Sequence, residues 1–210
     1  MNEKKQLESW TGDFGNDYIE RNELTDWKIP LAVKAFQPIL NNIEIESVLE
    51  VGSNVGINLA AINSIMDKKI KIFAVEPNKT AHGKLMENAG ATGITEAWNC
   101  DAFNLPLEDG SVDLAFTCGV LIHIHPNNLG KAADEIFRVS RKYVLCMEYF
   151  SHEPEEKPYR GQDGLLFKRD FGVYYLDRFE NLECIDYGFL WHRDNKLYDN
   201  VNWWLFKKSN

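Results

Sequence analysis

The chain has 210 residues, of which 44% are hydrophobic and 26% are charged, and its formal net charge is −9; this length suits one globular domain with a sizeable core. Its apolar runs are too short to span a bilayer, and an acidic chain without a dense block of Lys and Arg is a poor partner for a phosphate backbone, so neither a membrane nor a nucleic acid is an expected partner. The first residues contain no apolar run typical of a signal peptide and the four cysteines form no C-x-x-C pair, so we expect a cytoplasmic protein with free thiols.

Residues 1–46 carry aromatic and aliphatic side chains at near-helical spacing, which predicts helices ahead of the main domain. The plainer interpretation is that these side chains pack against the edge of a sheet. However, the stretch 14–22, which includes Tyr18 and Asn22, concentrates more aromatic and hydrogen-bonding groups than a packing helix needs. We therefore expect a helical N-terminal lid over residues 1–46 and a main domain over residues 47–210.

From residue 47 onward, strand-like and helix-like runs alternate, which is the pattern of βαβ units and predicts an α/β fold. Residues 48–56 read as a buried strand that runs into a glycine-bearing loop opening the next helix. Such a loop offers backbone N–H groups to an anionic or zwitterionic ligand. A dinucleotide-binding G-x-G-x-x-G motif counted from Gly52 would need glycines where Asn54 and Ile57 stand, so the spacing argues against NAD.

The same loop resembles the E-x-G-x-G-x-G motif of class I S-adenosylmethionine (SAM)-dependent methyltransferases. Glu50, Gly52 and Gly56 are kept, and Asn54, which tolerates positive φ, replaces the middle glycine. The alternative is a plain strand-turn-helix joint whose glycines serve packing. The resemblance implies a Rossmann-like class I fold, a seven-stranded and mostly parallel sheet with an antiparallel last strand, and SAM as the cofactor.

Two further segments agree with this resemblance in the same register. Glu76 ends the strand predicted over residues 70–75, where a carboxylate can accept hydrogen bonds from ribose hydroxyls or, alternatively, cap the next helix. Asp101-Ala102-Phe103 follows the third strand, and the resemblance implies that it recognises and covers the adenine, although Phe103 alternatively belongs to the core. Residues 105–116 then reproduce the class's turn-then-strand pattern "L-P-x-x-D-x-S-F-D-x-V", with Val112 at the usual Phe position.

The segment after the fourth strand, residues 117–126, should reach the crevice in which open parallel sheets bind ligands. Thr117, Cys118 and Gly119 are expected near the methionine half of the cofactor and His123 near the transferred methyl. His123 can act as a general base or merely hydrogen-bond the backbone. With His125 it forms an H-x-H pair, but no third ligand has suitable spacing, so no metal is expected.

The fifth strand ends at Glu148 and Tyr149, again at the functional edge. An unusually polar stretch at 151–162 follows, and we expect an irregular substrate loop over about residues 150–172. The last two strands are predicted near 182–187 and 202–207, the final one antiparallel by analogy with the class.

A narrower resemblance covers nearly the whole chain. The pseudaminic acid biosynthesis-associated methylase family is similar in the segments 10–18 and 21–22, 119–124, 148–149, 159–161, 167–171 and 202–205. This resemblance implies a methylase tied to making nonulosonic, sialic-like sugars for bacterial surface glycans. It leaves open two other classes, a methyltransferase acting on RNA or protein and a SAM-binding regulator without transfer activity.

The predicted site has three parts. The residues expected to bind the cofactor are Tyr18, Asn22, Glu50, Gly52, Ser53, Asn54, Gly56, Glu76, Pro77, Asp101, Ala102, Phe103, Thr117, Cys118 and Gly119. Those expected to act in catalysis are His123 or Glu148 as the base, with Tyr18 or Tyr149 orienting the acceptor. A small sugar or nucleotide-sugar acceptor is expected to contact Tyr18, His123, Tyr159, Arg160 and Lys168, and the protein is expected to be a monomer or homodimer.

Overall fold

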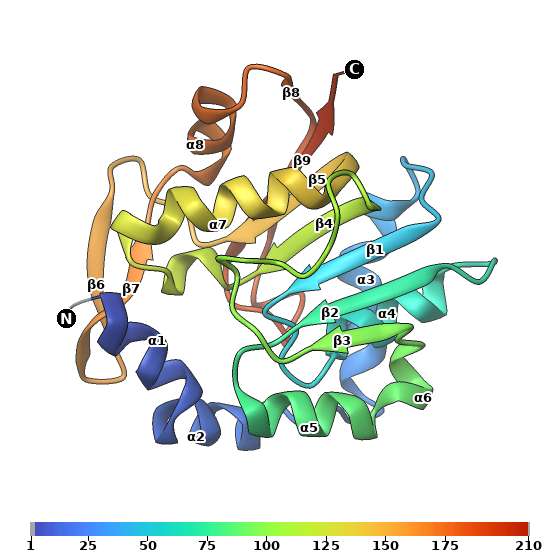
Figure 1. The fold of residues 1–210 in the computed structure, drawn as a ribbon. Coiled ribbons are helices and arrows are strands. Elements are labelled where there is room, and N and C mark those ends of the chain that lie inside the picture. Colours follow the sequence, from blue (N-terminus) through green and yellow to red (C-terminus); the bar gives the residue numbers. More distant parts are fainter. Residues whose placement is uncertain (1–2, 210) are drawn as a thin grey trace.

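The computed structural model describes residues 3–209 and contains a seven-stranded sheet with the order β3-β2-β1-β4-β5-β9-β8 (Figure 1). Strands β1 to β5 are parallel and β9 runs antiparallel to both β5 and β8, which confirms the predicted Rossmann-like α/β fold. The strands are β1 (Ser47–Val51), β2 (Lys71–Val75), β3 (Glu96–Trp98), β4 (Val112–Cys118), β5 (Ser140–Glu148), β8 (Leu182–Leu190) and β9 (Val201–Lys208).

Helices cover both faces of the sheet. Apolar side chains of α3 (Lys28–Leu40) and α4 (Ile57–Ile65) pack in one core cluster, and those of α7 (Pro126–Val139) and α8 (Phe171–Arg178) pack in the other. Strand β1 is buried from end to end, as expected for a central parallel strand with helices on both faces. The remaining elements on these faces are α5 (Lys79–Glu87), α6 (Ala89–Thr92) and the single 3-10 turn η1 (Leu121–His123).

The position of the crevice follows from the strand order. Strand β1 lies between β2 and β4, and the chain leaves β1 toward α4 but leaves β4 toward η1 and α7 on the opposite face. Connections that diverge to opposite faces open a crevice beyond the carboxyl ends of the strands, and this is where open α/β sheets bind ligands. The sheet order therefore predicts a site above β1 and β4.

Two smaller parts stand at this edge of the sheet. Helices α1 (Glu3–Thr11) and α2 (Asp13–Arg21) lie beside the hairpin of β6 (Glu155–Tyr159) and β7 (Gln162–Lys168) (Figure 1). The prediction of an irregular loop after β5 is wrong at this point, because the polar stretch pairs into a hairpin. The reason is its turn: Arg160 and Gly161 have φ of 51° and 77°, and two successive positive φ angles match the twist of a two-residue hairpin turn.

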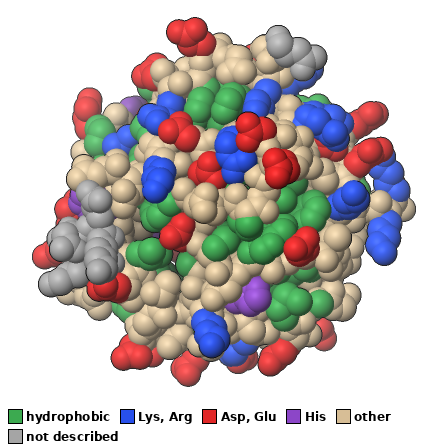
Figure 2. Space-filling model, viewed as in Figure 1, with side chains coloured by type: hydrophobic (Ala, Val, Ile, Leu, Met, Phe, Trp, Pro, Cys, Tyr) green, Lys and Arg blue, Asp and Glu red, His purple; other side chains and the backbone are tan. Residues whose placement is uncertain are grey.

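The surface carries charges of both signs. On the face shown in Figure 2, Lys and Arg side chains are interspersed with Asp and Glu. Of the helices in the described part of the chain, none is long and apolar enough to cross a membrane.

Candidate active site

A cavity of about 420 Å³ opens at the carboxyl edge of the sheet. Many parts of the chain line it, and they include helices α1 and α2, the ends of β1, β2 and β4, the loop after β1, the segment 101–103, η1, the residue after β5, the turn of the β6–β7 hairpin and the loop before β9. The cavity is thus walled by segments from nearly the whole length of the chain.

The loop after β1 has the conformation that its sequence predicts. Gly52, Asn54 and Gly56 all have positive φ, at 79°, 48° and 88°. Gly52, Ser53 and Asn54 line the cavity, and a Cβ at Gly52 would meet Val120 at 2.5 Å. The close approach of β1 to the turn after β4 therefore requires glycine at this position.

Gly56 is placed differently from the prediction. It begins α4, and a Cβ there would lie 2.7 Å from both Leu85 and Thr92. These neighbours belong to α5 and α6, and Gly56 is not among the cavity-lining residues. Its positive φ serves the close packing of α4 against these helices, so it is not retained as a cofactor contact.

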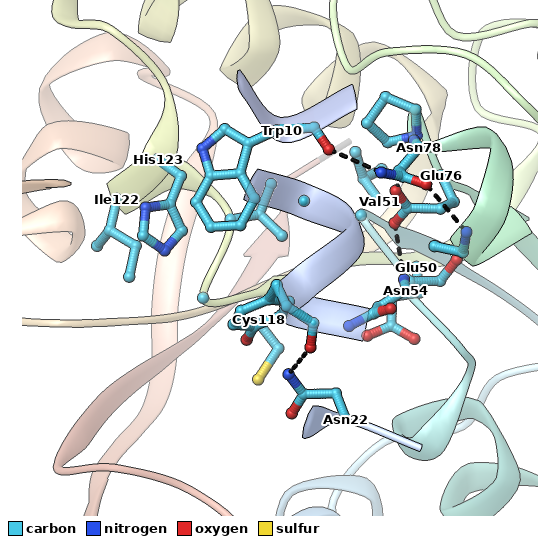
Figure 3. Close-up of a pocket in the computed structure, with 18 of the residues that line it drawn as sticks. Trp10, Asn22, Glu50, Val51, Asn54, Glu76, Asn78, Cys118, Ile122 and His123 are labelled. Carbon is cyan, nitrogen blue, oxygen red and sulfur yellow. Dashed lines mark hydrogen bonds between the residues drawn. The ribbon is translucent and has the colours of Figure 1, made fainter. Parts of the chain in front are cut away.

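Glu76 ties the loops after β1 and β2 together. Its two carboxylate oxygens accept hydrogen bonds from the backbone N–H groups of Asn54 and Asn78, each at 2.8 Å (Figure 3). The side chain is 7% exposed and lines the cavity. Burial raises the pKa of this carboxyl to about 7, although the two hydrogen bonds oppose the shift. The neighbouring Pro77 also faces the cavity.

Glu50 brings a second buried carboxyl to the same end of the cavity. Burial raises its pKa to about 8. One oxygen, Oε1, accepts a hydrogen bond from Asn58 at 2.7 Å, whereas Oε2 has no partner among the described side chains and backbone groups of residues 3–209. The Oδ1 atom of Asn54 is likewise buried without a partner within that range. This end of the cavity therefore offers unfilled hydrogen-bond acceptors.

The segment 101–103 forms a further part of the lining. Asp101, Ala102 and Phe103 all face the cavity. One oxygen of Asp101 accepts a hydrogen bond from the Phe103 N–H at 2.9 Å, which fixes the carboxylate relative to the aromatic ring. The predicted pairing of an acidic and an aromatic side chain is thus present at the edge beyond β3.

His123 lies in the cavity as a neutral ring. Its Nδ1 atom is 2.6 Å from the carbonyl oxygen of Leu165, and because a carbonyl only accepts, Nδ1 carries the proton and Nε2 keeps a lone pair. The Trp10 and Tyr159 rings pack around it, with ring centres 4.3 Å and 5.0 Å away. This burial lowers the pKa of His123 to about 4. The ring of His125, the other histidine of the H-x-H pair, caps α7 instead, where it accepts a hydrogen bond from the Asn127 N–H.

Glu148 does not reach the cavity, which corrects its prediction as a base. The side chain is fully buried and outside the lining. Its carboxylate accepts hydrogen bonds from the backbone N–H groups of Val120, Leu121 and Ile122 at 3.1, 3.0 and 3.3 Å. Burial nevertheless raises its pKa to about 7. Glu148 therefore holds the η1 turn that carries His123. Thr117 is also buried outside the lining, whereas Cys118 and Gly119 face the cavity.

Tyr149 does line the cavity, and its hydroxyl donates a hydrogen bond to Asp199 at 2.5 Å. Lys168 is not a lining residue, and its ammonium lies 5.3 Å from the centre of the Tyr149 ring. It is therefore placed behind Tyr149 and not at the predicted acceptor site. The predicted acceptor residues that do come together in the cavity are Tyr18, His123, Tyr159 and Arg160.

Tyr18 and Asn22 enter the cavity from α2. Burial raises the pKa of the Tyr18 hydroxyl well above its ordinary value, so it stays protonated and able to donate a hydrogen bond. Asn22 closes the end of α2, where its side-chain amide donates to the Tyr18 carbonyl at 2.9 Å. The expected clustering of these two residues at the sheet edge is therefore observed.

Several lining residues were not predicted from the sequence. They come from α1 and from the loop before β9, and the most prominent are Gln6, Trp10, Tyr198 and Asp199. Tyr198 connects to the cofactor end, because its hydroxyl donates to Asn58 at 2.6 Å. The polar and aromatic run at 192–199 resembles in composition the other lining segments, and this is the signal that could have identified it.

The residues present suit a cofactor that carries positive charge. Glu50 Oε2 and Asn54 Oδ1 are buried acceptors without partners in the described chain, and the carboxyl of Glu76 lies beside them. SAM has an ammonium and a sulfonium that such groups stabilise, and its ribose hydroxyls can donate to Glu76. Among the side chains that the structure describes, no group of three His, Cys, Asp or Glu is placed to hold a metal ion.

Comparisons with known proteins agree with this geometry. Residues 49–147 match the family model described as a methyltransferase domain. A comparison with curated protein sequences found no match.

Three solved structures show the same fold. The 1,6-didemethyltoxoflavin-N1-methyltransferase of Burkholderia thailandensis has a TM-score of 0.74 at 15% identity, covering 100% of this chain and 92% of that one. A SAM-dependent methyltransferase of Leishmania major gives 0.73 at 12%, with 97% and 82% covered. The magnesium protoporphyrin IX methyltransferase of Synechocystis PCC 6803 gives 0.68 at 12%, with 100% and 98% covered.

The sheet order, the glycine loop and the cavity define a Rossmann-like protein of the class I methyltransferase type. The matched methyltransferase domain spans β1 to β5, which carry the cofactor end of the cavity. Residues 49–147 form a methyltransferase domain, and together with this fold they indicate a SAM-dependent methyltransferase whose cofactor is SAM.

Proposed function

We propose that the protein transfers the methyl group of SAM to an oxygen or nitrogen atom of a small acceptor bound between α1, η1 and the β6–β7 turn. The observation that carries this proposal is the division of the cavity. One end is formed by the loops after β1 and β2, and the other by aromatic side chains and Arg160 around His123.

At the cofactor end, we propose that the loop of Gly52, Ser53 and Asn54 receives the amino-acid part of SAM. The carboxylate of Glu76 accepts from the ribose hydroxyls. Asp101 accepts from the adenine amino group, with Phe103 against the ring. Tyr18 and Asn22 cover the cofactor from α2, and Cys118 and Gly119 border its methionine half. Support comes from the lining, which includes all of these residues.

At the acceptor end, the structure supports a compact polar molecule. The aromatic rings of Trp10 and Tyr159 enclose His123, and the Arg160 guanidinium lies 5.7 Å from the Tyr159 ring centre. A guanidinium grips a carboxylate or phosphate with two parallel hydrogen bonds. Together with the family resemblance, this favours a nonulosonic sugar or its nucleotide-linked precursor, used in bacterial surface glycan biosynthesis.

The chemistry asks little of the protein beyond alignment and proton removal. SAM supplies a methyl on a sulfonium that is already a good leaving group. His123 accepts the acceptor's proton at Nε2, because Nδ1 is held by Leu165. Tyr149, fixed by Asp199, orients the nucleophile. Placing these groups on a rigid sheet edge lowers the entropy cost of alignment.

The N-terminal segment and the location of the protein belong to the same proposal. Helices α1 and α2, within residues 1–46, act as a lid, since both contribute cavity-lining side chains. The polar stretch within residues 150–172 supplies the acceptor contacts. All four cysteines are free thiols, which is typical of a reducing compartment and supports a cytoplasmic enzyme. We propose a monomer or homodimer.

Calorimetry with S-adenosylhomocysteine (SAH) tests the cofactor end, and incubation with labelled SAM tests the acceptor. Separate pools of sugars and nucleotide sugars, RNA, and protein are compared, and label is expected in the sugar pool. Label in RNA or protein would assign the enzyme to a macromolecular class. SAH binding without label in any pool would favour a SAM-binding regulator.

A further inference from the structure

Helix α1 presents two hydrogen-bond donors to the cavity that no group of the described chain uses. Gln6 and Trp10 lie one helical turn apart and both line the cavity. Oε1 of Gln6 accepts a hydrogen bond from the His125 N–H at 2.5 Å. This contact identifies the other amide atom, Nε2, as a donor. Gln6 Nε2 and Trp10 Nε1 are both buried and have no partner among the groups that the structure describes.

These donors surround the residue assigned to proton removal. The Trp10 ring lies beside the His123 ring (Figure 3). Gln6 is hydrogen-bonded to the backbone N–H of His125, two residues after His123. The Tyr159 ring is 6.2 Å from the Trp10 ring between centres. The guanidinium of the next residue, Arg160, lies 5.7 Å from the centre of the Tyr159 ring. Two neutral donors on α1 thus lie beside His123, and one cation lies on the neighbouring turn of the β6–β7 hairpin.

The loops after β1 and β2, which Trp10 reaches through its carbonyl and the Asn78 amide at 3.0 Å, have the reverse polarity. There, within the described chain, the unpartnered buried atoms are acceptors, Glu50 Oε2 and Asn54 Oδ1. A buried polar group without a partner destabilises the protein unless a ligand completes its hydrogen bond. The acceptors match the positive charges of SAM. The donors on α1 require a ligand atom that accepts, and a negatively charged oxygen forms the strongest bonds of this kind.

We propose that Gln6 and Trp10 are specificity-determining residues that, with Arg160, form a subsite for the carboxylate or phosphoryl oxygens of the methyl acceptor. This inference rests on the proposed function and names the chemical class of its substrate. It also gives α1 a chemical role, because the helix then recognises the acceptor as well as covering the cavity. The subsite places the anionic group next to His123, so the acceptor's nucleophile is a near neighbour of its acidic group.

Two substitutions remove the donors with little change of shape. Gln6→Glu keeps an oxygen for the His125 N–H but replaces the donor with a negative charge. Trp10→Phe removes the indole N–H and keeps an aromatic ring. Matched controls on the surface are Gln37→Glu and Trp27→Phe, since both parent residues are exposed. Thermal melting checks that each variant is folded.

The probes are two pairs of sugars, titrated by calorimetry into protein saturated with SAH. N-acetylneuraminic acid is compared with its methyl ester, and UDP-N-acetylglucosamine with N-acetylglucosamine. The first pair reports a carboxylate and the second a phosphoryl group. We expect the charged member of at least one pair to bind about tenfold more tightly or better, and Gln6→Glu and Trp10→Phe to remove most of that preference while the controls retain it.

The affinity for SAH separates the outcomes. Equal binding of charged and neutral members by the wild type, or an unchanged preference in both α1 variants, would overturn the inference. So would a comparable loss of SAH affinity in these variants, because the donors would then hold the cofactor's own carboxylate. A wild type that fails to bind SAH at all would instead contradict the proposed function.

Discussion

Replacing Glu76 with Gln is expected to have opposite effects on cofactor binding and on stability at alkaline pH. The buried carboxylate of Glu76 accepts two backbone hydrogen bonds, yet burial still raises its pKa to about 7. Ionising Glu76 therefore costs free energy in the folded protein. The ionised form is nevertheless the better hydrogen-bond acceptor for the ribose hydroxyls. A glutamine side chain at this position would be neutral at every pH and could offer only one accepting atom.

The magnitudes follow from the pKa. Between the ordinary value of 4.5 and about 7 the folded state holds a proton that the unfolded state has lost. The contribution of Glu76 to the free energy of unfolding therefore falls as pH rises through this window, by about 3 kcal/mol. Relative to wild type, Glu76→Gln should gain this amount between pH 4.5 and pH 8, roughly 6–12 °C in melting temperature. Loss of a charge-assisted bond to ribose should weaken SAH binding by about 1.5–3 kcal/mol, roughly 10- to 150-fold.

Melting curves from pH 4.5 to 8 and calorimetry with SAH at pH 8 measure the two effects. Glu148→Gln is the matched control, because that carboxyl also has a pKa of about 7 but lies outside the cavity. It should show the same trend of stability with pH and an SAH affinity within about twofold of wild type. The reasoning is refuted if Glu76→Gln binds SAH normally, or if both variants lose affinity equally.

The remaining predictions concern the acceptor end and the glycine loop. Arg160→Ala should raise the KM of the acceptor by about tenfold or more without changing SAH affinity, and a loss of SAH affinity would place Arg160 at the cofactor instead. His123→Ala should lower kcat by about 100-fold because the base is lost. His123→Asn can keep a donor to the Leu165 carbonyl but has no base, so it should lower kcat equally. Near-normal turnover in either variant would show that aligning the acceptor is sufficient and that His123 does not remove the proton. Because burial lowers the pKa of His123 to about 4, its neutral base form persists as pH falls from 8 to about 5 and is lost toward pH 4. The value of kcat should therefore stay constant down to about pH 5 and fall toward pH 4. Gly52→Ala should lower stability by about 1–2 kcal/mol and abolish detectable SAH binding, because its φ is 79° and the new Cβ would clash with Val120; unchanged melting and calorimetry would show that the loop can relax.

The cofactor end could be predicted because its residues occur in short motifs. Glu50, Gly52, Glu76 and Asp101 each lie at or just after the end of a strand of the parallel sheet, and parallel strands bring their carboxyl ends to one edge. Alternating strand and helix patterns fixed the order of these segments. For this reason, local sequence was sufficient for the fold and for most of the lining of this end of the cavity, with Gly56, Thr117 and Tyr198 as the exceptions.

The errors have two physical causes. Glu148 was assigned by its position at a strand end, but successive strand residues point to opposite faces, so Tyr149 faces the cavity while Glu148 turns to the backbone of η1. Gln6 and Trp10 were missed because they precede the stretch 14–22 and no local pattern marks them, and Asp199 was missed although the polar and aromatic composition of 192–199 was a signal. They reach the cavity only through tertiary packing of the two ends of the chain around the sheet.

The cavity's two ends also differ in how the chain encodes them. The cofactor end lies mostly within the single stretch 49–147 that matches the methyltransferase domain, whereas the acceptor end also draws on α1, the β6–β7 hairpin and the loop before β9, which flank it. Such an arrangement is modular: the flanks can be exchanged between enzymes while the central unit continues to bind the same donor molecule. Grafting α1 together with the hairpin onto another enzyme of this fold is therefore a rational route to moving acceptor choice between scaffolds.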